Sequence, residues 1–241
     1  MQWLSVDPMS DERPWISPYN YCQWNPIGRV DTWGMLDEIV IKGMDGSKTT
    51  YMPGMSSEGC DEFTAKVINN YNEAYSGSAT AREDIDNLVN AKGTYTVIKS
   101  RDGRNDFLRG TDENGNRGGT IFFNPVGVEV PTQQHAYSTQ TNAKNPGKDP
   151  VIDLIHETIH ASRWEQGILI ENGSQTNGTL NEEIATMHRE NMVRRDLKAP
   201  LRTHYKWVKS EGKIIGAAGY QMLKFNKENG EIISNCPDYL R

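Results

Sequence analysis

Two histidines and a glutamate in the order H-E-x-x-H are the residues whose spacing points most directly to chemistry. His156, Glu157 and His160 lie in the stretch VIDLIHETIHASRWEQG, which spans residues 151–167. In an α-helix, residues four apart lie on the same face, one turn above each other. Two imidazoles presented in this way can bind one metal ion, and the glutamate can reach a water molecule on it. The pattern therefore predicts a metal site.

The residues around this motif predict the helix that would present it. Asp149 can cap the helix, Pro150 suits its first turn, and Gly167 is a suitable stop. If the spacing were a coincidence, two imidazoles would lie in a mostly apolar helix, where an unpaired imidazole loses its hydrogen bonds to water. The metal interpretation is therefore preferred. The apolar positions are Val151, Ile152, Leu154, Ile155, Ile159 and Trp164.

A zinc hydrolase site needs a third protein ligand and keeps one position open for water. Residues 181–191 (NEEIATMHREN) predict a second helix, capped by Asn181 and ending before Pro200. From spacing alone, Glu182 and Glu183 are equal candidates for the third ligand. The helix dipole also favours carboxylates in a first turn, so capping alone explains Glu182 equally well.

Other histidines compete for the same role. His188 lies five residues after Glu183, nearly half a turn around the helix, so we expect it beside the ligands or exposed to solvent. His204 is a further candidate ligand, and His135 lies in a polar stretch where solvation is expected.

The composition describes a rather polar protein with no membrane-spanning run of apolar residues. Hydrophobic residues make up 36% of the 241 residues, and the mean hydropathy is −0.70. A net charge of −6 argues against nucleic acid as a partner, because phosphate binding requires clustered lysines and arginines. The cluster of Arg194, Arg195, Lys198 and Arg202 favours either an acidic partner or, more simply, a solvated helix end. Three scattered cysteines exclude a disulfide framework.

The remaining elements follow from periodicity and turn residues, and together they predict an α+β fold. We expect a hairpin around Asp45-Gly46. We interpret the polar, glycine-rich residues 101–119 as a long hairpin connection or a mobile loop, and residues 131–149 as an exposed loop. Such a fold would place a small twisted sheet over the metal helix, with a second helical part below it. The other predicted elements are helices at 61–75 and 80–91 and strands at 94–99 and 120–124.

The first 34 residues have a different texture, dense in proline, tryptophan, tyrosine and asparagine. Their motifs resemble the end of the Rhs/YD-repeat-associated core, which closes the shell of polymorphic toxins just before the variable toxic domain. The resemblance implies that residues 1–34 end such a core and that residues 35–241 form the toxic domain. It departs at TWG (32–34), where the family usually has Pro-x-Gly. The matching segments are WLSVDP (3–8), SPYNY (17–21), NPI (25–27) and VD (30–31).

A second resemblance covers about residues 110–210. HETIHA (156–161) followed by EEIAT (182–186) is similar to the clostridial neurotoxin light chains, which pair HELIHA with EELRT. More closely, the chain resembles the NleD-like effector peptidases and their toxin-domain relatives. Thr158 replaces the usual leucine of that family, and Lys198-Ala199 stand where it often has glycine. The further matching residues are Glu190-Asn191, Arg194 and LRTHY (201–205).

This resemblance assigns roles that spacing alone leaves open. It implies that Glu183 is the third zinc ligand and that the fold is zincin-like. In the neurotoxins an R-x-x-Y pair lies beside the metal, which implies that Arg202 and Tyr205 stabilise the oxyanion. The simpler alternatives are a surface salt bridge for Arg202 and a half-buried core aromatic for Tyr205. Glu157 would act as general base for the water on one Zn²⁺ ion.

The expected function is therefore a zinc endopeptidase that forms the toxic C-terminal domain of a secreted Rhs-type toxin. Its expected partners are a protein substrate in the cytoplasm of a target cell and a cognate immunity protein. Thr120 to Phe123 is the candidate edge strand for an extended substrate. One alternative is a non-enzymatic binding module with a structural metal site, and another is a fragment of the Rhs shell whose histidines pack without metal.

Overall fold

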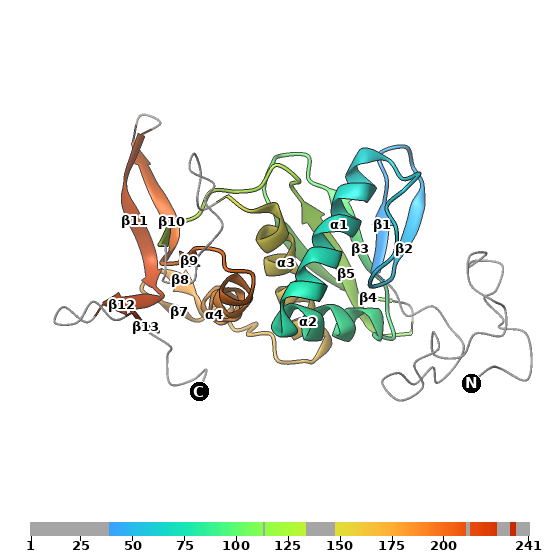
Figure 1. Ribbon diagram of the computed structural model, residues 1–241. Helices are drawn as coiled ribbons and strands as arrows, with labels where there is room; N and C mark the ends of the chain where they lie inside the picture. Colours follow the sequence, from blue (N-terminus) through green and yellow to red (C-terminus); the bar gives the residue numbers. More distant parts are fainter. Residues whose placement is uncertain (1–38, 113, 134–147, 211–212, 226–231, 235–241) are drawn as a thin grey trace, which may run out of the picture.

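The computed structural model describes residues 39–112, 114–133, 148–210, 213–225 and 232–234. Residues 1–34, assigned above to an Rhs-type core, and His135 lie outside the described residues. The described part contains four helices, a small mixed sheet and further two-stranded sheets, so the predicted α+β class is confirmed (Figure 1). Within it, no helix is both long and apolar enough to cross a membrane.

A five-stranded sheet in the order β2-β1-β3-β5-β4 forms the larger half of the molecule. β1, β3 and β5 are parallel, while β2 and β4 run antiparallel to their neighbours at the two edges. The predicted hairpin at Asp45-Gly46 is confirmed: Gly46 adopts a positive φ of 88° in the turn between β1 and β2. The strands are β1 (Ile39–Lys42), β2 (Lys48–Tyr51), β3 (Tyr95–Lys99), β4 (Asp106–Thr111) and β5 (Arg117–Phe123).

Strand β4 corrects two expectations. Residues 101–119 were interpreted as a connection, yet Asp106–Thr111 pairs along its whole length with β5. The segment lacks a continuous apolar pattern because an edge strand leaves much of itself in water. The candidate edge strand Thr120 to Phe123 was wrong, since β5 lies between β3 and β4. The edge strand on this side of the sheet is therefore β4.

Helices cover one face of this sheet (Figure 1). α1 (Glu62–Gly77) and α2 (Ala79–Val89) match the predicted helices, with Asp61 and Ser78 as their N-caps. α3 (Pro150–Glu165) is the predicted metal helix. Asp149 caps it as expected by accepting hydrogen bonds from the backbone N–H groups of Val151 and Ile152. A shared apolar core joins the three helices to the sheet.

The smaller half of the molecule surrounds a single helix, α4 (Asn181–Asp196). Short hairpins accompany it, so the predicted second helical part is instead mostly β structure. The predicted cap was also wrong: Asn181 lies inside the helix, and its side chain bonds Ser174 and Thr176. The strands are β6 (Thr132–Gln133), β7 (Gln175–Thr176), β8 (Thr179–Leu180), β9 (Leu201–Arg202), β10 (His204–Ser210), β11 (Lys213–Gln221), β12 (Leu223–Phe225) and β13 (Ile232–Ser234).

Candidate metal centre

Helix α3 presents both histidines of the HExxH motif on its face toward α4. The ring centroids of His156 and His160 lie 5.0 Å apart, and the two rings are nearly perpendicular. Both side chains are largely buried, with 12% and 10% of their surface exposed. The rest of α3 is anchored by apolar side chains in the core beneath the sheet, which fixes the height and rotation of the two imidazoles.

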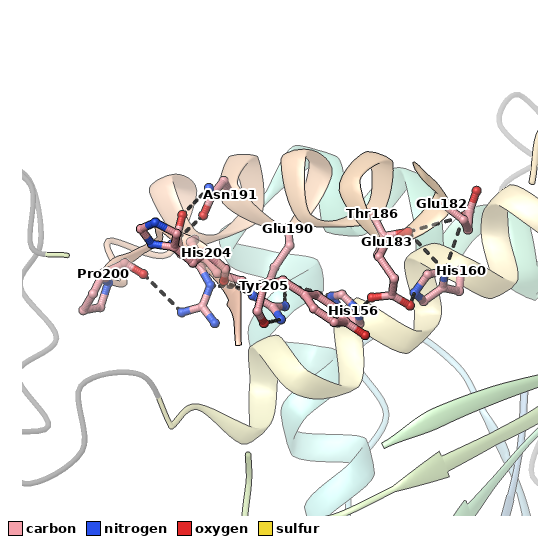
Figure 2. Close-up of polar contacts among 12 residues, drawn as sticks. His156, His160, Glu182, Glu183, Thr186, Glu190, Asn191, Pro200, His204 and Tyr205 are labelled. Atoms are coloured by element: carbon pink, nitrogen blue, oxygen red, sulfur yellow. Dashed lines mark hydrogen bonds and ion pairs between the residues drawn. The ribbon is translucent and has the colours of Figure 1, made fainter. Parts of the chain in front are cut away.

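Glu183 of α4 reaches between these two rings (Figure 2). Its carboxylate oxygens lie 3.5 Å from His156 Nε2 and 3.3 Å from His160 Nε2. One ligand atom from each of the three residues lies within 4.8 Å of the other two, so this cluster could hold a metal ion. The structure thus separates the two glutamates that spacing left equal: Glu183 faces both Nε2 atoms, and Glu182 does not.

The other nitrogen of each imidazole has its own partner on α4. His156 Nδ1 lies 2.8 Å from Glu190 Oε2. His160 Nδ1 lies 3.3 Å from Glu182 Oε1 and 3.1 Å from Thr186 Oγ1. Because a carboxylate only accepts hydrogen bonds, a neutral ring that carries its proton on Nδ1 can donate to these partners and leaves its Nε2 lone pair for a metal ion. This orientation is the one that metal binding requires.

Glu182 does more than favour the start of the helix, because its side chain contacts several other segments. Its carboxylate accepts two hydrogen bonds from Arg163, at 2.7 and 3.0 Å, and one from the backbone N–H of Ile170 at 2.8 Å. Burial by itself raises the pKa of Glu182, but the bonds to His160 and Arg163 outweigh it and leave this pKa below its usual value. Glu182 therefore links the segment after α3, through Ile170, to the candidate ligand His160.

Glu190 lies at the centre of a buried ionic network. It accepts hydrogen bonds from Arg194 Nε at 2.5 Å and from Arg202 Nη1 at 2.8 Å, in addition to His156. Although burial opposes ionisation, the two guanidinium groups hold the pKa of Glu190 well below its usual range. Asn191 completes the network by exchanging two hydrogen bonds with the backbone of Arg202, which fastens β9 to α4.

This network corrects the expectation of a solvated basic cluster. Arg194 and Arg202 are 1% and 7% exposed and are paired with Glu190, whereas Arg195 and Lys198 are exposed. The alternative of a surface salt bridge for Arg202 is wrong for the same reason. Net charge counted along the sequence did not reveal that these arginines offset a buried carboxylate.

Arg202 and Tyr205 both line the cleft that contains the metal cluster. Arg202 Nη2 donates to the backbone carbonyl of Tyr205 at 2.7 Å, and its guanidinium lies 5.9 Å from the centre of the Tyr205 ring. Tyr205 is half-buried. Burial and the charge of Glu183 raise the pKa of Tyr205, so its hydroxyl keeps its proton and can donate a hydrogen bond.

Glu157 lies beside the cluster and lines the same cleft. It is 7% exposed, and burial raises the pKa of its carboxyl, although the neighbouring histidines oppose this shift. A carboxylate with a raised pKa accepts a proton more readily. The cleft measures about 1390 Å³ and runs between the edge strand β4 and the connection from α3 to α4.

The two competing histidines of the described chain lie elsewhere. The ring of His188 packs 6.1 Å from that of Tyr220, and burial lowers the pKa of His188 to about 4. His204 Nδ1 contacts its neighbour Thr203 Oγ1 at 3.1 Å. Neither residue belongs to the cluster of His156, His160 and Glu183.

Sequence reasoning named Glu182 and Glu190 but did not predict that they orient the imidazoles, although a signal was present. Glu183, Thr186, Glu190 and Arg194 are spaced three or four apart, which places polar side chains along one face of α4. A polar stripe of this kind usually marks the face of a helix that is exposed to solvent, but these residues are mostly buried.

Comparisons with protein-family models, with curated proteins and with solved structures find no match to this chain.

Proposed function

We propose that the chain is a zinc-dependent endopeptidase with a zincin-like fold, in which His156, His160 and Glu183 hold one Zn²⁺ ion. The observation that carries the proposal is the convergence of both Nε2 atoms on Glu183 within an open cleft. A small sheet above the HExxH helix, with an antiparallel edge strand beside the cleft, supports the fold assignment.

The donor set suits catalytic zinc better than structural zinc. Two histidines and one glutamate leave a fourth position for water, whereas structural sites are closed and usually richer in cysteine. Because the cluster opens onto a cleft, a water molecule and a substrate can reach this position. Bound zinc would supply a water molecule of lowered pKa and polarise the substrate carbonyl.

In this proposal Glu157, Tyr205 and Arg202 have separate roles in peptide hydrolysis. Glu157 takes a proton from the attacking water and passes it to the amine that leaves when the peptide bond breaks. The Tyr205 hydroxyl donates a hydrogen bond to the oxyanion, an effect worth about 3–4 kcal/mol in comparable sites. Arg202 holds the Tyr205 backbone and offsets Glu190, so its main role is to keep Tyr205 in place. An extended substrate would add to the edge of β4.

The biological setting is also a proposal. The residues that resemble NleD-like peptidases, including Glu190, Asn191 and Arg202, meet at one site in the structure. Together with the Rhs-like segment before them, they support a toxic domain delivered into a target cell, with a protein substrate there and a cognate immunity protein. Fold and site by themselves do not define the substrate protein.

The test is the variant Glu157→Gln, with Glu58→Gln as a matched control. Glu58 is exposed and does not line the cleft. Glu157→Gln should bind zinc with unchanged stoichiometry but lose about 10²–10⁴-fold in cleavage rate, while the control stays active. Metal analysis and mass spectrometry of new protein termini in cells expressing each variant measure both quantities.

Three outcomes would count against this function. Full activity of Glu157→Gln would refute the mechanism. Purified protein without stoichiometric zinc would refute the metal site and favour a shell fragment. Zinc held by four protein ligands, with no cleavage by the unmodified chain, would favour the binding module with a structural metal site.

A further inference from the structure

The cleft exposes apolar surface on both of its walls. Leu108 of β4 and Leu180 of β8 are 59% and 43% exposed, and both line the cleft. Leu169 and Ile170, in the connection after α3, add partly exposed apolar side chains to the same wall as Leu180. Large side chains exposed in this way lose ordered water when an apolar ligand covers them, which favours binding.

The charged groups nearby are largely neutralised. Three of the four arginines that line the cleft have a carboxylate partner within 2.9 Å. An incoming peptide therefore meets little net charge where it meets most apolar surface. The pairs are Arg104 with Asp102, Arg109 with Glu171, and Arg202 with Glu190.

The direction of β4 relates this apolar surface to the position of Glu157. Trp164, near the end of α3, donates a hydrogen bond from Nε1 to the carbonyl of Gly110 at 3.3 Å. Asp106, at the start of β4, lines the cleft together with Glu157, which lies about two helical turns before Trp164. β4 therefore runs in the same direction as α3, and Leu108 lies about 7 Å along the strand from the Glu157 end.

A peptide added antiparallel to β4 runs from the Trp164 end toward Glu157. Antiparallel pairing is the more stable of the two arrangements. The residues before the scissile bond then lie along Leu108, and those after it pass beyond Asp106. Lys99, the last residue of β3, and Arg101, in the connection before β4, are exposed and lie on this second side.

We propose that this cleft selects extended polypeptides with a large apolar side chain within about three residues before the scissile bond, in the part of the cleft that Leu108 and Leu180 line. The inference depends on the proposed peptidase function and specifies the class of substrate. Burial of one leucine-sized side chain accounts for about tenfold to about hundredfold in selectivity.

The experiment separates binding from cleavage. Synthetic peptides that differ at one position, leucine against serine, are titrated against zinc-loaded Glu157→Gln protein, and fluorescence polarisation gives the affinity. The unmodified protein is then incubated with a random-sequence peptide library, and mass spectrometry locates the cuts. We expect leucine to improve affinity at least about tenfold and apolar residues to be enriched before the cut.

Matched variants test the two walls. Leu108→Ser and Leu180→Ser should each lose this preference by about tenfold or more. Ile168→Ser and Val126→Ser change residues that are 52% and 65% exposed but do not line the cleft, so they should retain it. Because all four side chains are exposed, none of these variants should alter folding.

The inference and the proposed function can fail separately. Equal affinity for leucine and serine peptides, enrichment only after the cut, or equal loss in the Ile168 control would overturn the inference. If selective binding is retained but the unmodified zinc-loaded protein cuts no peptide, the proposed function fails and the cleft remains a site for apolar polypeptides.

Discussion

Helix α3, which carries the histidines, and helix α4, which carries Glu183, are held in place by different forces. α3 packs apolar residues such as Leu154 and Ile155 into the large core beneath the sheet. α4 lies between that core and a second, smaller one: Val193 packs on the first and Met187 on the second. Between these contacts α4 buries charged groups, with Glu190 as the centre.

This difference shows how two kinds of interaction can build one site: apolar packing positions the helix that carries the histidines, and directional hydrogen bonds orient their rings. Apolar packing is strong but non-directional, so it sets where α3 lies. Buried hydrogen bonds to charge are directional, and they fix the rotation of each imidazole and the position of β9. The site should therefore be far more sensitive to charge removal on α4 than its polar sequence suggests.

The largest expected effect comes from the centre of the network. Glu190→Gln leaves Arg194 and Arg202 buried without a balancing charge. We expect the free energy of unfolding to fall by about 3–5 kcal/mol, measured by urea denaturation. The control Glu171→Gln breaks an exposed pair and should change it by about 0–1 kcal/mol. Similar values for both variants would refute the contrast between the helices.

The next effect concerns zinc and pH. Burial lowers the pKa of His156 and His160, but hydrogen bonds to their glutamate partners outweigh it and raise these values to about 9 and about 10, against 6.5 for an ordinary imidazole. Without zinc, the stabilisation from the charged rings is present below about pH 6.5 and is lost as the pH rises through about 9–10. Zinc binding requires neutral rings, so zinc affinity should increase as the pH rises through the same range.

The melting temperature should therefore rise more on zinc addition at about pH 9 than at about pH 6. Zinc at about 100 times its dissociation constant stabilises a protein by about 2.7 kcal/mol. Scanning calorimetry with zinc and with a chelator measures the difference. His204→Gln, which changes a histidine outside the cluster, should behave like the unmodified chain. A zinc effect independent of pH would contradict the assignment of the ligands.

The smallest effect tests how α4 orients a ligand that belongs to α3. Glu182→Gln weakens the hold on His160, and we expect zinc affinity to fall about 10- to 100-fold in a chelator competition assay. Thr186→Val removes a neutral partner of the same nitrogen and should cost only about 0.5–1.5 kcal/mol. If Thr186→Val had the larger effect, the carboxylate would not be the main positioning group.

The sequence predicted those elements whose local signals, such as caps and apolar periodicity, match the structure that the segment adopts in the folded protein. Asp149, Pro150 and the apolar spacing of α3 specify a helix without reference to other segments. β4 was missed because Asp106–Thr111 is half in water and becomes a strand through pairing with β5. Asn181 was misread as a cap because its hydrogen bonds go to Ser174 and Thr176, in a turn that only the folded chain brings near.

By itself the sequence determined that His156 and His160 share one helical face, since helix geometry alone places residues four apart one turn above each other. Only the tertiary structure decided that Glu183 rather than Glu182 meets them, because the choice depends on how α4 crosses α3. It also decided that Arg194 and Arg202 are buried counter-charges to Glu190. Contacts between segments far apart in the chain carry no local periodicity, so packing alone assigns them.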